Sequence, residues 1–138
     1  MIFHIHKIDY CPANLAGEIN YLPDTESAIS ATGTPWIPLL IAGLAQLEMT
    51  EERENGLPKF TAKLTAKLCS GRLLMTNASP LLYRLTTAAG RKLLLGLPRH
   101  PYPMTVQNVT VPKSAAEPSY VSLEVTLTAD FPILSLYE

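Results

Sequence analysis

The stretch AQLEMTEERENGLPKFTAKLTAKL, residues 45–68, decides the fold because apolar and polar side chains alternate along it. An alternation with a period of two is typical of a strand that has one buried face. Asn55-Gly56 lies between the two alternating runs and is the strongest short-range signal for a two-residue hairpin turn. In the second run one face carries Phe60, Ala62, Leu64, Ala66 and Leu68, and the other carries Lys59, Thr61, Lys63, Thr65 and Lys67.

A turn centred on Asn55-Gly56 also sets the register of the two strands. It places Glu52 opposite Lys59 and Glu48 opposite Lys63, so that acids of one strand face lysines of the other. Each such cross-strand pair contributes roughly 0.2–1 kcal/mol. The same register pairs Thr50 with Thr61, Gln46 with Thr65, Met49 with Ala62, Leu47 with Leu64 and Ala45 with Ala66. We therefore predict a hairpin in which the Lys/Thr face of one strand meets a Glu/Thr/Gln face of the other.

A helix over residues 35–54 is the alternative, and the sequence leaves it open. Thr34 is a suitable N-cap and Pro35 suits the first helical position. The apolar residues that follow have helical spacing, and the composition from Leu39 to Glu54 suits a helix as well. The spacing is carried by Ile37, Leu40, Ile41 and Leu44.

A second hairpin is expected over residues 81–97, LLYRLTTAAGRKLLLGL. The three-residue loop Ala88-Ala89-Gly90 suits a type I turn followed by a glycine in the left-handed region. This loop sets three apolar pairs on one face, namely Leu85 with Leu93, Tyr83 with Leu95 and Leu81 with Leu97.

Short strands are also expected at residues 2–10, 104–111 and 120–131, and in the C-terminal tail ILSLYE. Residues 98–103 form a proline-rich extended connector. Residues 11–34 show no sustained period and are expected to be loop-rich, with room for a short strand over residues 17–22. The 12 prolines leave little space for long helices. The fold class predicted for residues 1–138 is a single all-β domain, a mainly antiparallel sandwich or small barrel with at most one or two short helices.

The composition excludes several classes of protein. A hydrophobic content of 47% and a charged content of 17% are incompatible with a disordered chain. The net charge of −1 provides no global attraction to nucleic acid or to an anionic membrane. The longest apolar stretch is far shorter than the ~20 residues of a membrane-spanning helix, and the N-terminus lacks a secretory pattern. We expect a cytoplasmic protein that does not enter a membrane.

No catalytic motif is recognisable, and we expect neither an enzyme nor a bound cofactor. His4 and His6 share one parity of a strand and are the candidate metal ligands, but a catalytic zinc usually has three protein ligands. Cys69 would act as a nucleophile only with a neighbouring base. The acidic run from Glu48 to Glu54 is expected to be a solvated hairpin end.

A basic patch is the basis of the alternative function. Arg84, Lys92 and Arg99, with Tyr102 near them in sequence, are the types of residue with which an OB-like barrel binds single-stranded nucleic acid. Arg91, His100 and Tyr83 are the further candidates. The low aromatic content of 7% and the negative net charge make this partner class the weaker expectation.

The chain from Gly56 onward resembles small all-β structural proteins encoded by phages and prophages. The similarity lies in the order of four segments over residues 56–138: ENGLPKFTAKLTAKL, YRLTTAAGRKLLLG, LPRHPYP and YVSLEVTLTADFP. The resemblance implies a virion or tail-associated component without catalysis, and it transfers no functional residues.

The function expected from sequence is therefore structural. A compact β protein of this kind would act through contacts with other protein subunits, as a homo-oligomer or within a phage particle. Trp36 is a candidate contact residue if it is exposed, and a core anchor if it is not.

Overall fold

The computed structural model describes residues 2–15, 19–30, 36–68, 80–98, 101–110 and 120–137. Within these residues the chain forms one sheet of eleven strands, in the order β2-β3-β11-β8-β7-β1-β5-β6-β10-β9, with β4 beside β1. All pairs are antiparallel except β3 with β11. The strands are β1 (Ile2–Pro12), β2 (Ile19–Leu22), β3 (Ser27–Ser30), β4 (Ile37–Leu39), β5 (Ala45–Glu54), β6 (Leu57–Leu68), β7 (Leu81–Thr87), β8 (Lys92–Leu95), β9 (Met104–Thr110), β10 (Tyr120–Ala129) and β11 (Leu134–Tyr137). Two 3-10 turns, η1 (Ala13–Leu15) and η2 (Pro23–Thr25), are the helical elements of the described residues.

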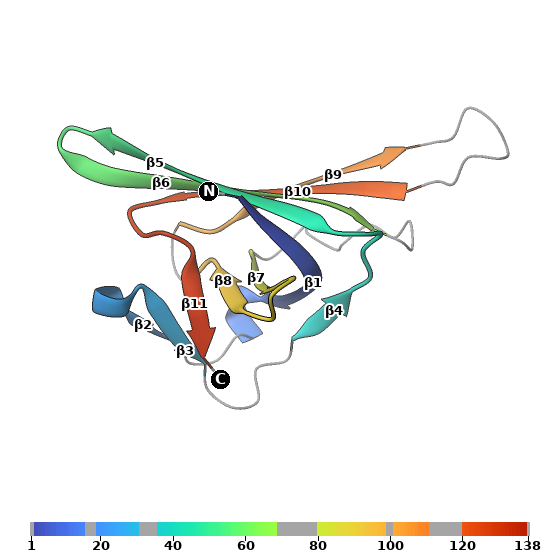
Figure 1. The fold of residues 1–138 in the computed structure, drawn as a ribbon, viewed down its shortest axis with the longest axis horizontal. Coiled ribbons are helices and arrows are strands. Elements are labelled where there is room, and N and C mark those ends of the chain that lie inside the picture. Colours follow the sequence, from blue (N-terminus) through green and yellow to red (C-terminus); the bar gives the residue numbers. More distant parts are fainter. Residues whose placement is uncertain are drawn as a thin grey trace, which may run out of the picture.

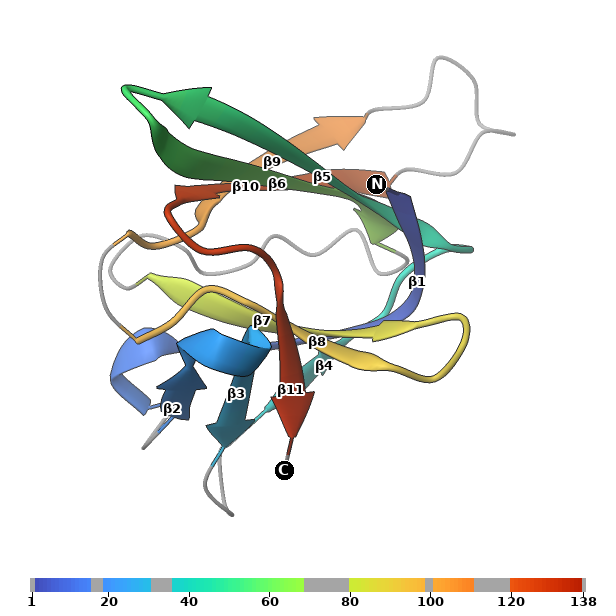
Figure 2. The same ribbon diagram turned by 60° about the vertical axis from the view of Figure 1, so that its left-hand side comes forward.

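The sheet is open and folds over into two layers (Figures 1 and 2). One layer contains β5, β6, β10 and β9, and the other contains β7, β8, β11, β3 and β2. Strand β1 connects them, because Ile2–Ile5 pair with β5 whereas the rest of β1 pairs with β7. The register shifts between Ile5 and Lys7, and a bulge of this kind bends a strand. The all-β, mainly antiparallel fold predicted from the sequence is confirmed, in the form of one folded sheet.

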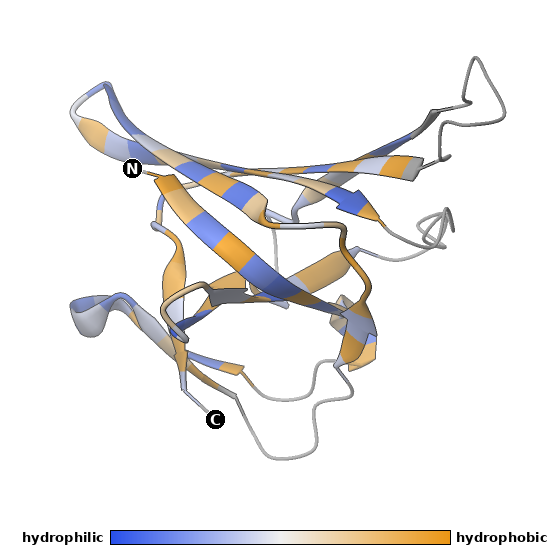
Figure 3. Cartoon of the chain, turned by 45° about the vertical axis from the view of Figure 1, so that its right-hand side comes forward, coloured by the Kyte–Doolittle hydropathy of each residue, from blue (hydrophilic) through white to orange (hydrophobic). Residues whose placement is uncertain are grey.

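The core lies between the two layers. Every second side chain is buried along β6 from Ala62 and along β10 from Val121. Figure 3 shows the matching alternation of hydrophobic and hydrophilic residues along the strands of this layer. The core includes Leu47, Leu64, Leu123 and Val125 from one layer and Ile8, Leu85, Leu93 and Leu95 from the other. Burying one such aliphatic side chain contributes about 1.5–3 kcal/mol, so this shared core accounts for the folding over of the sheet.

The hairpin predicted at Asn55-Gly56 is confirmed, and the helix over residues 35–54 is excluded, since β4 and β5 lie in that segment and none of its described residues is helical. The register matches the prediction for every pair from Gln46–Thr65 to Glu52–Lys59. Asn55 and Gly56 have φ values of 54° and 80°, the left-handed values that this turn requires.

The ion pairs of the hairpin differ from the prediction. Lys59 Nζ lies 3.2 Å from Glu54 Oε2, and Lys63 Nζ lies 3.3 Å from Glu124 Oε1 of β10. A lysine side chain is long enough to reach a diagonal neighbour, and a residue of β6 has acids available on two flanking strands. The lysines are thus neutralised, but by different acids from those directly opposite them.

The second hairpin is also confirmed, with Tyr83 opposite Leu95, Leu85 opposite Leu93 and Gly90 at a φ of 91°. The strands expected near residues 104–111 and 120–131 and in the tail are β9, β10 and β11. In β1 the bulge changes the predicted parity, so that Ile5 and Ile8 are both buried in the core.

The loop-rich segment predicted over residues 11–34 contains more regular structure than expected. β2 lies within residues 17–22, the position of the possible short strand, and it pairs with β3. Strands of four residues are too short to show a sustained alternation. The second neighbour of β3 is β11 at the other end of the chain, so no local signal marks it. No described helix is long and apolar enough to cross a membrane.

Candidate functional site

The most buried charged group in the described part of the chain is Asp9, and it is paired with Arg84. The two residues lie directly opposite each other on β1 and β7. Asp9 Oδ2 accepts a hydrogen bond from Arg84 Nε at 3.0 Å and forms an ion pair with Arg84 Nη2 at 2.9 Å. The side chains are only 3% and 15% exposed, so water screens this pair weakly.

Trp36 covers the ion pair. Its ring centroid lies 5.2 Å from Arg84 Cζ, within the range of a cation–π contact. Trp36 directly precedes β4, whose Pro38 lies opposite Asp9 on the other side of β1. The indole Nε1 is buried and has no hydrogen-bond partner among the described residues. Trp36 therefore anchors β4 to the sheet, which is the core role that the sequence left open for it.

This cluster joins strands β1, β4 and β7 through contacts among its own side chains. The Arg84 guanidinium is neutralised by Asp9 and covered by Trp36, so it does not offer a positive charge to solvent. Asp9 in turn holds β1 against β7. The sequence singled out Trp36 and Arg84 as separate contact candidates, and the structure brings the two together in a partly buried cluster.

Cys11 lies on the same side of the sheet, two residues after Asp9, and is fully buried beside Leu82. Burial raises the pKa of the Cys11 thiol. The thiolate is the nucleophilic form of cysteine, so burial disfavours the reactive form of this residue. Cys69 lies outside the described residues.

The candidate metal ligands His4 and His6 are both exposed on β1. His6 lies at the bulge, and its Nδ1 donates to the carbonyl oxygen of Thr87 at 2.9 Å, which uses one of its two ring nitrogens. No group of three or more His, Cys, Asp or Glu side chains within the described residues is arranged to hold a metal ion.

The described members of the predicted basic patch lie in different surroundings. Tyr83 is fully buried, and its hydroxyl lies 2.6 Å from Thr105 Oγ1, so its ring is not available for stacking on a base. Lys92 is exposed at the start of β8, opposite Thr86, and Tyr102 is half-buried before β9. Arg99 and His100 lie outside the described residues.

A broad polar surface covers the outward face of the layer made by β5, β6 and β10. It is the Lys/Thr face of β6 together with the polar residues of its two neighbours, and Figure 3 shows the alternation along these strands. Its exposed members include Gln46, Glu48, Thr50, Lys63, Thr65, Lys67, Glu124 and Thr128.

The polar surface ends at β9, where exposed side chains are apolar. Met104 is 68% exposed and Val106 is 46% exposed. Sequence reasoning identified the strand but missed these residues, since alternation alone does not tell which side of an edge strand faces water.

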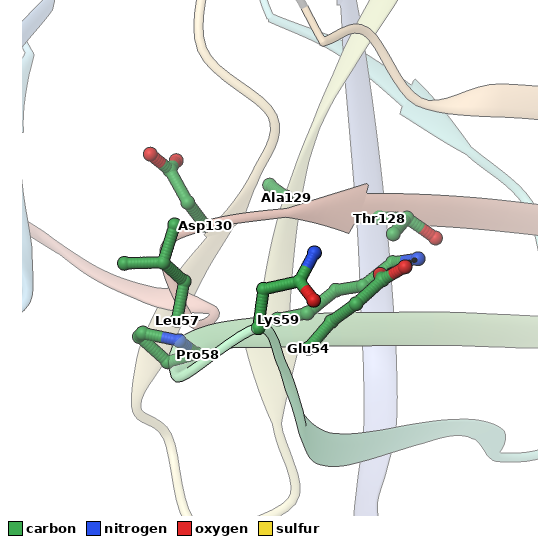
Figure 4. A pocket seen from close by; sticks show the side chains of 8 residues that line it. Glu54, Leu57, Pro58, Lys59, Thr128, Ala129 and Asp130 are labelled. Carbon is green, nitrogen blue, oxygen red and sulfur yellow. Dashed lines mark hydrogen bonds and ion pairs between the residues drawn. The ribbon is translucent and has the colours of Figure 1, made fainter.

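The tip of the β5–β6 hairpin bears an open hollow of ≈ 380 Å³, lined by both arms and by the end of β10. In Figure 4, Lys59 and Glu54 extend side by side toward Thr128. Leu57 and Pro58 line the same hollow as Asp130, and Leu57 is 69% exposed. A second open hollow lies beside the bulge of β1 and is lined by His4, Thr87 and Arg91 among others.

Comparison of the chain with protein-family models, with curated proteins and with solved structures finds no match.

Proposed function

We propose that this chain is a non-enzymatic assembly protein that acts through contacts with other protein subunits. The layout of residues 56–138 supports a phage or prophage origin, as a virion or tail-associated component made in the host cytoplasm. Protein subunits are the partners in this proposal, and no cofactor takes part.

The observation that carries the proposal is the projecting tip of the β5–β6 hairpin, defined as residues 51–58. All of these residues are exposed. Pairing of β6 with β10 ends at Phe60–Ala129, and pairing of β5 with β1 ends at Glu48–Ile2, so the tip has only two strands. Figure 1 shows it extending beyond the rest of the molecule. An isolated two-stranded ribbon is marginally stable in water, and packing against a partner would stabilise it.

The exposed chemistry of the tip suits a protein partner. Leu57 offers an apolar contact, and charged residues surround it. An apolar centre within a polar rim is the usual organisation of a protein interface. Nucleic acid fits this surface less well, because Glu51, Glu52 and Glu54 give the tip an acidic character that repels phosphate.

The test is to purify particles released from a host that carries the gene within a prophage. We expect mass spectrometry to find the chain in the particles, and deletion of the gene to reduce the number of complete particles. The double variant Leu57→Ser/Pro58→Ser should lower incorporation, whereas Thr61→Ser on the body of the same hairpin should not. Absence of the chain from particles that assemble normally without it would refute the proposal.

A further inference from the structure

We infer that β11 is an exchangeable strand: in the assembled state, the β11 of one copy of this chain lies between β3 and β8 of a second copy, and the second copy returns its own β11 in the same way. This inference rests on the proposed function, because it names a second copy as an assembly partner and β11 as the element that joins the two copies.

The first step is that β11 lies between two strands that it alone connects in the described sheet. Residues 135–137 pair with β3 in parallel, and residues 134–135 pair with β8 in antiparallel orientation. Within the described residues β3 and β8 do not pair with each other. The position between β3 and β8, here termed the β11 slot, is therefore occupied by a single strand of four residues.

The second step is that the β11 slot recognises the sequence of β11. The side chains of Leu134 and Leu136 are buried in the core. Between them, Ser135 N donates to the carbonyl oxygen of Glu26 at 3.2 Å, and Ser135 Oγ accepts a hydrogen bond from Arg91 Nη2. The slot thus selects a strand with two apolar side chains separated by a hydroxyl. Every copy of the chain carries that strand, so exchange requires no new interface.

The third step is that β11 is joined to β10 through a short hinge, defined as residues 130–133. β10 pairs with β6 and β9 in one layer, whereas β11 pairs in the other layer. In Figures 1 and 2 the red strand β11 leaves the end of β10 and runs to the layer that contains β3. Release of β11 at the hinge therefore leaves the pairing of β10 intact.

The fourth step is that the composition of the hinge favours an extended backbone. The chain bends at Asp130 and Phe131, which turns β11 toward its own slot. Pro132 follows, and a residue that precedes a proline is biased toward extended conformations. Ile133 N donates to the sulfur of Met49 at 3.3 Å, and a thioether is a weak acceptor. A short hinge of this kind invites exchange of the element that it connects.

The fifth step is that the hinge lies beside the surface to which the proposed function assigns the partner. Asp130 lines the same hollow as Leu57 and Pro58 of the hairpin tip, as Figure 4 shows. An extended hinge consequently leaves the body of the molecule next to the tip. Two copies that exchange β11 meet at this surface.

The experiment places one cysteine on each side of the β11 slot, in two different preparations. Tyr137 lies opposite Ile29, and both side chains are exposed. Neighbouring strands are about 5 Å apart, which is within the reach of a disulfide. Ile29→Cys is made in an isotope-labelled chain and Tyr137→Cys in an unlabelled one, both with Cys11 and Cys69 replaced by alanine. The two are unfolded, mixed, refolded together at high concentration and oxidised.

Exchange of β11 predicts a covalent dimer of twice 15.1 kDa. Mass spectrometry should find one labelled and one unlabelled chain in it. The double variant Ile29→Cys/Tyr137→Cys, refolded at low concentration, should form the same bond within one chain and thereby verifies that the two positions are in register. Circular dichroism verifies the fold of each variant.

Asn20→Cys is the matched control for Ile29→Cys. Asn20 is also exposed and lies opposite Ile29 on β2, one strand farther from Tyr137. Two strand spacings amount to about 9–10 Å, beyond the ~7 Å between Cα atoms that a disulfide spans. A mixture of Asn20→Cys and Tyr137→Cys chains should therefore give no covalent dimer above the level of random collision.

The length of the hinge provides a second readout that needs no disulfide. Sedimentation velocity should show that the wild-type chain dimerises as the refolding concentration rises. Insertion of four Gly and Ser residues after Asp130 should raise the dissociation constant by at least about tenfold, because a long flexible hinge lets β11 reach its own slot. Asp130→Ser changes the hinge without lengthening it and is the matched control, expected to dimerise like the wild type.

The outcomes separate this inference from the proposed function. A bond that forms within the double variant, but not between mixed chains above the Asn20→Cys level, would overturn the exchange and leave assembly through the hairpin tip in place. If the double variant forms no bond, the hinge insertion decides, and an unchanged dissociation constant or a wild-type monomer at every concentration would overturn the exchange. The particle experiment decides the proposed function in each case.

Discussion

Asp9 and Arg84 form a contact in which one carboxylate oxygen accepts a hydrogen bond from Nε at 3.0 Å and lies 2.9 Å from Nη2 of the guanidinium. The pair joins β1 to β7 at the point where Trp36 fixes β4 from the other side. Because both side chains are largely withdrawn from water, either charge left alone would be poorly solvated. The strength of the contact therefore depends on both partners being present.

Removing one partner of this pair should be strongly destabilising. We expect Asp9→Ala to lower the free energy of unfolding by about 3–5 kcal/mol, because it leaves a mostly buried guanidinium without its counter-charge. Urea denaturation measures this loss. The double variant Asp9→Leu/Arg84→Met has no unpaired charge and should recover most of the stability. A loss below about 1 kcal/mol for Asp9→Ala would mean that water solvates Arg84 after all.

Tyr83 should make the fold sensitive to alkaline pH. Burial raises the pKa of Tyr83 to about 12, although the hydrogen bond to Thr105 lowers it and the charge of Tyr10 raises it further. A tyrosine in the unfolded chain ionises near pH ~10. Since the folded-state pKa is the higher one, the contribution of Tyr83 to stability is complete below about pH 10 and is lost as the pH rises toward about 12.

The matched variant for this prediction is Tyr83→Phe. At neutral pH it should cost roughly 0.5–1.5 kcal/mol through loss of the hydrogen bond to Thr105. Above about pH 10 the wild type should lose stability relative to the variant, by up to about 2–3 kcal/mol. Denaturation curves at several alkaline pH values measure the difference. Parallel curves for the two proteins would show that Tyr83 ionises as readily in the folded state as in the unfolded state.

Substitution of two glycines compares the stability cost of backbone strain alone with the cost of strain and a steric clash together. Gly90 and Gly96 have φ values of 91° and 96°, but a Cβ at Gly90 meets open space, whereas one at Gly96 would lie 2.7 Å from the Cγ atom of Pro103. We expect Gly90→Ala to cost about 1–2 kcal/mol from strain alone. Gly96→Ala should cost more, about 2–5 kcal/mol, because the proline ring is rigid. Thermal melts compare the two, and equal costs would contradict the close packing of Pro103 on Gly96.

The two faces of β6 should differ in their tolerance of substitution. Leu64 is fully buried, and Leu64→Ala should lower the free energy of unfolding by about 2–5 kcal/mol. Lys63 and its partner Glu124 are about half exposed, so Lys63→Ala should change the free energy of unfolding by less than about 1 kcal/mol. Chemical denaturation of the two variants tests this contrast. A cost for Lys63→Ala as large as that of Leu64→Ala would indicate that the polar face is covered in solution.

The pairing of β5 with β6 was predictable residue by residue because two local signals agree. Asn55-Gly56 fixes the turn, and the alternation on either side fixes which residues are buried. A slip of one residue would move the whole apolar set into water, so only one register is compatible with the sequence. The helical spacing of residues 37–44 competed with this signal, and the pairing of Ile37–Leu39 with β1 overrides it.

The candidate site was predictable only in its parts. Trp36 and Arg84 stood out in the sequence, but their contact did not, and Asp9 was not recognised as the partner of an arginine. Asp9 and Arg84 are 75 residues apart along the chain, and no periodicity links residues so far apart. The strand β9 was readable from the sequence, whereas the exposure of Met104 and Val106 and the place of β9 at the end of the strand order were not.

The sequence by itself determined the two hairpins, at Asn55-Gly56 and at Ala88–Gly90, with their registers and with the side chains that β6 and β10 bury, because turn chemistry and side-chain alternation act over a few residues. The tertiary structure alone decided that β1 bends at a bulge to join two layers and that β3 pairs with β11 across the length of the chain. It also decided that Asp9 meets Arg84 under Trp36 and that β9 ends the strand order of the described sheet. These features depend on which distant segments compete most favourably for the same core and the same backbone hydrogen bonds, and that competition is settled only when the whole chain has folded.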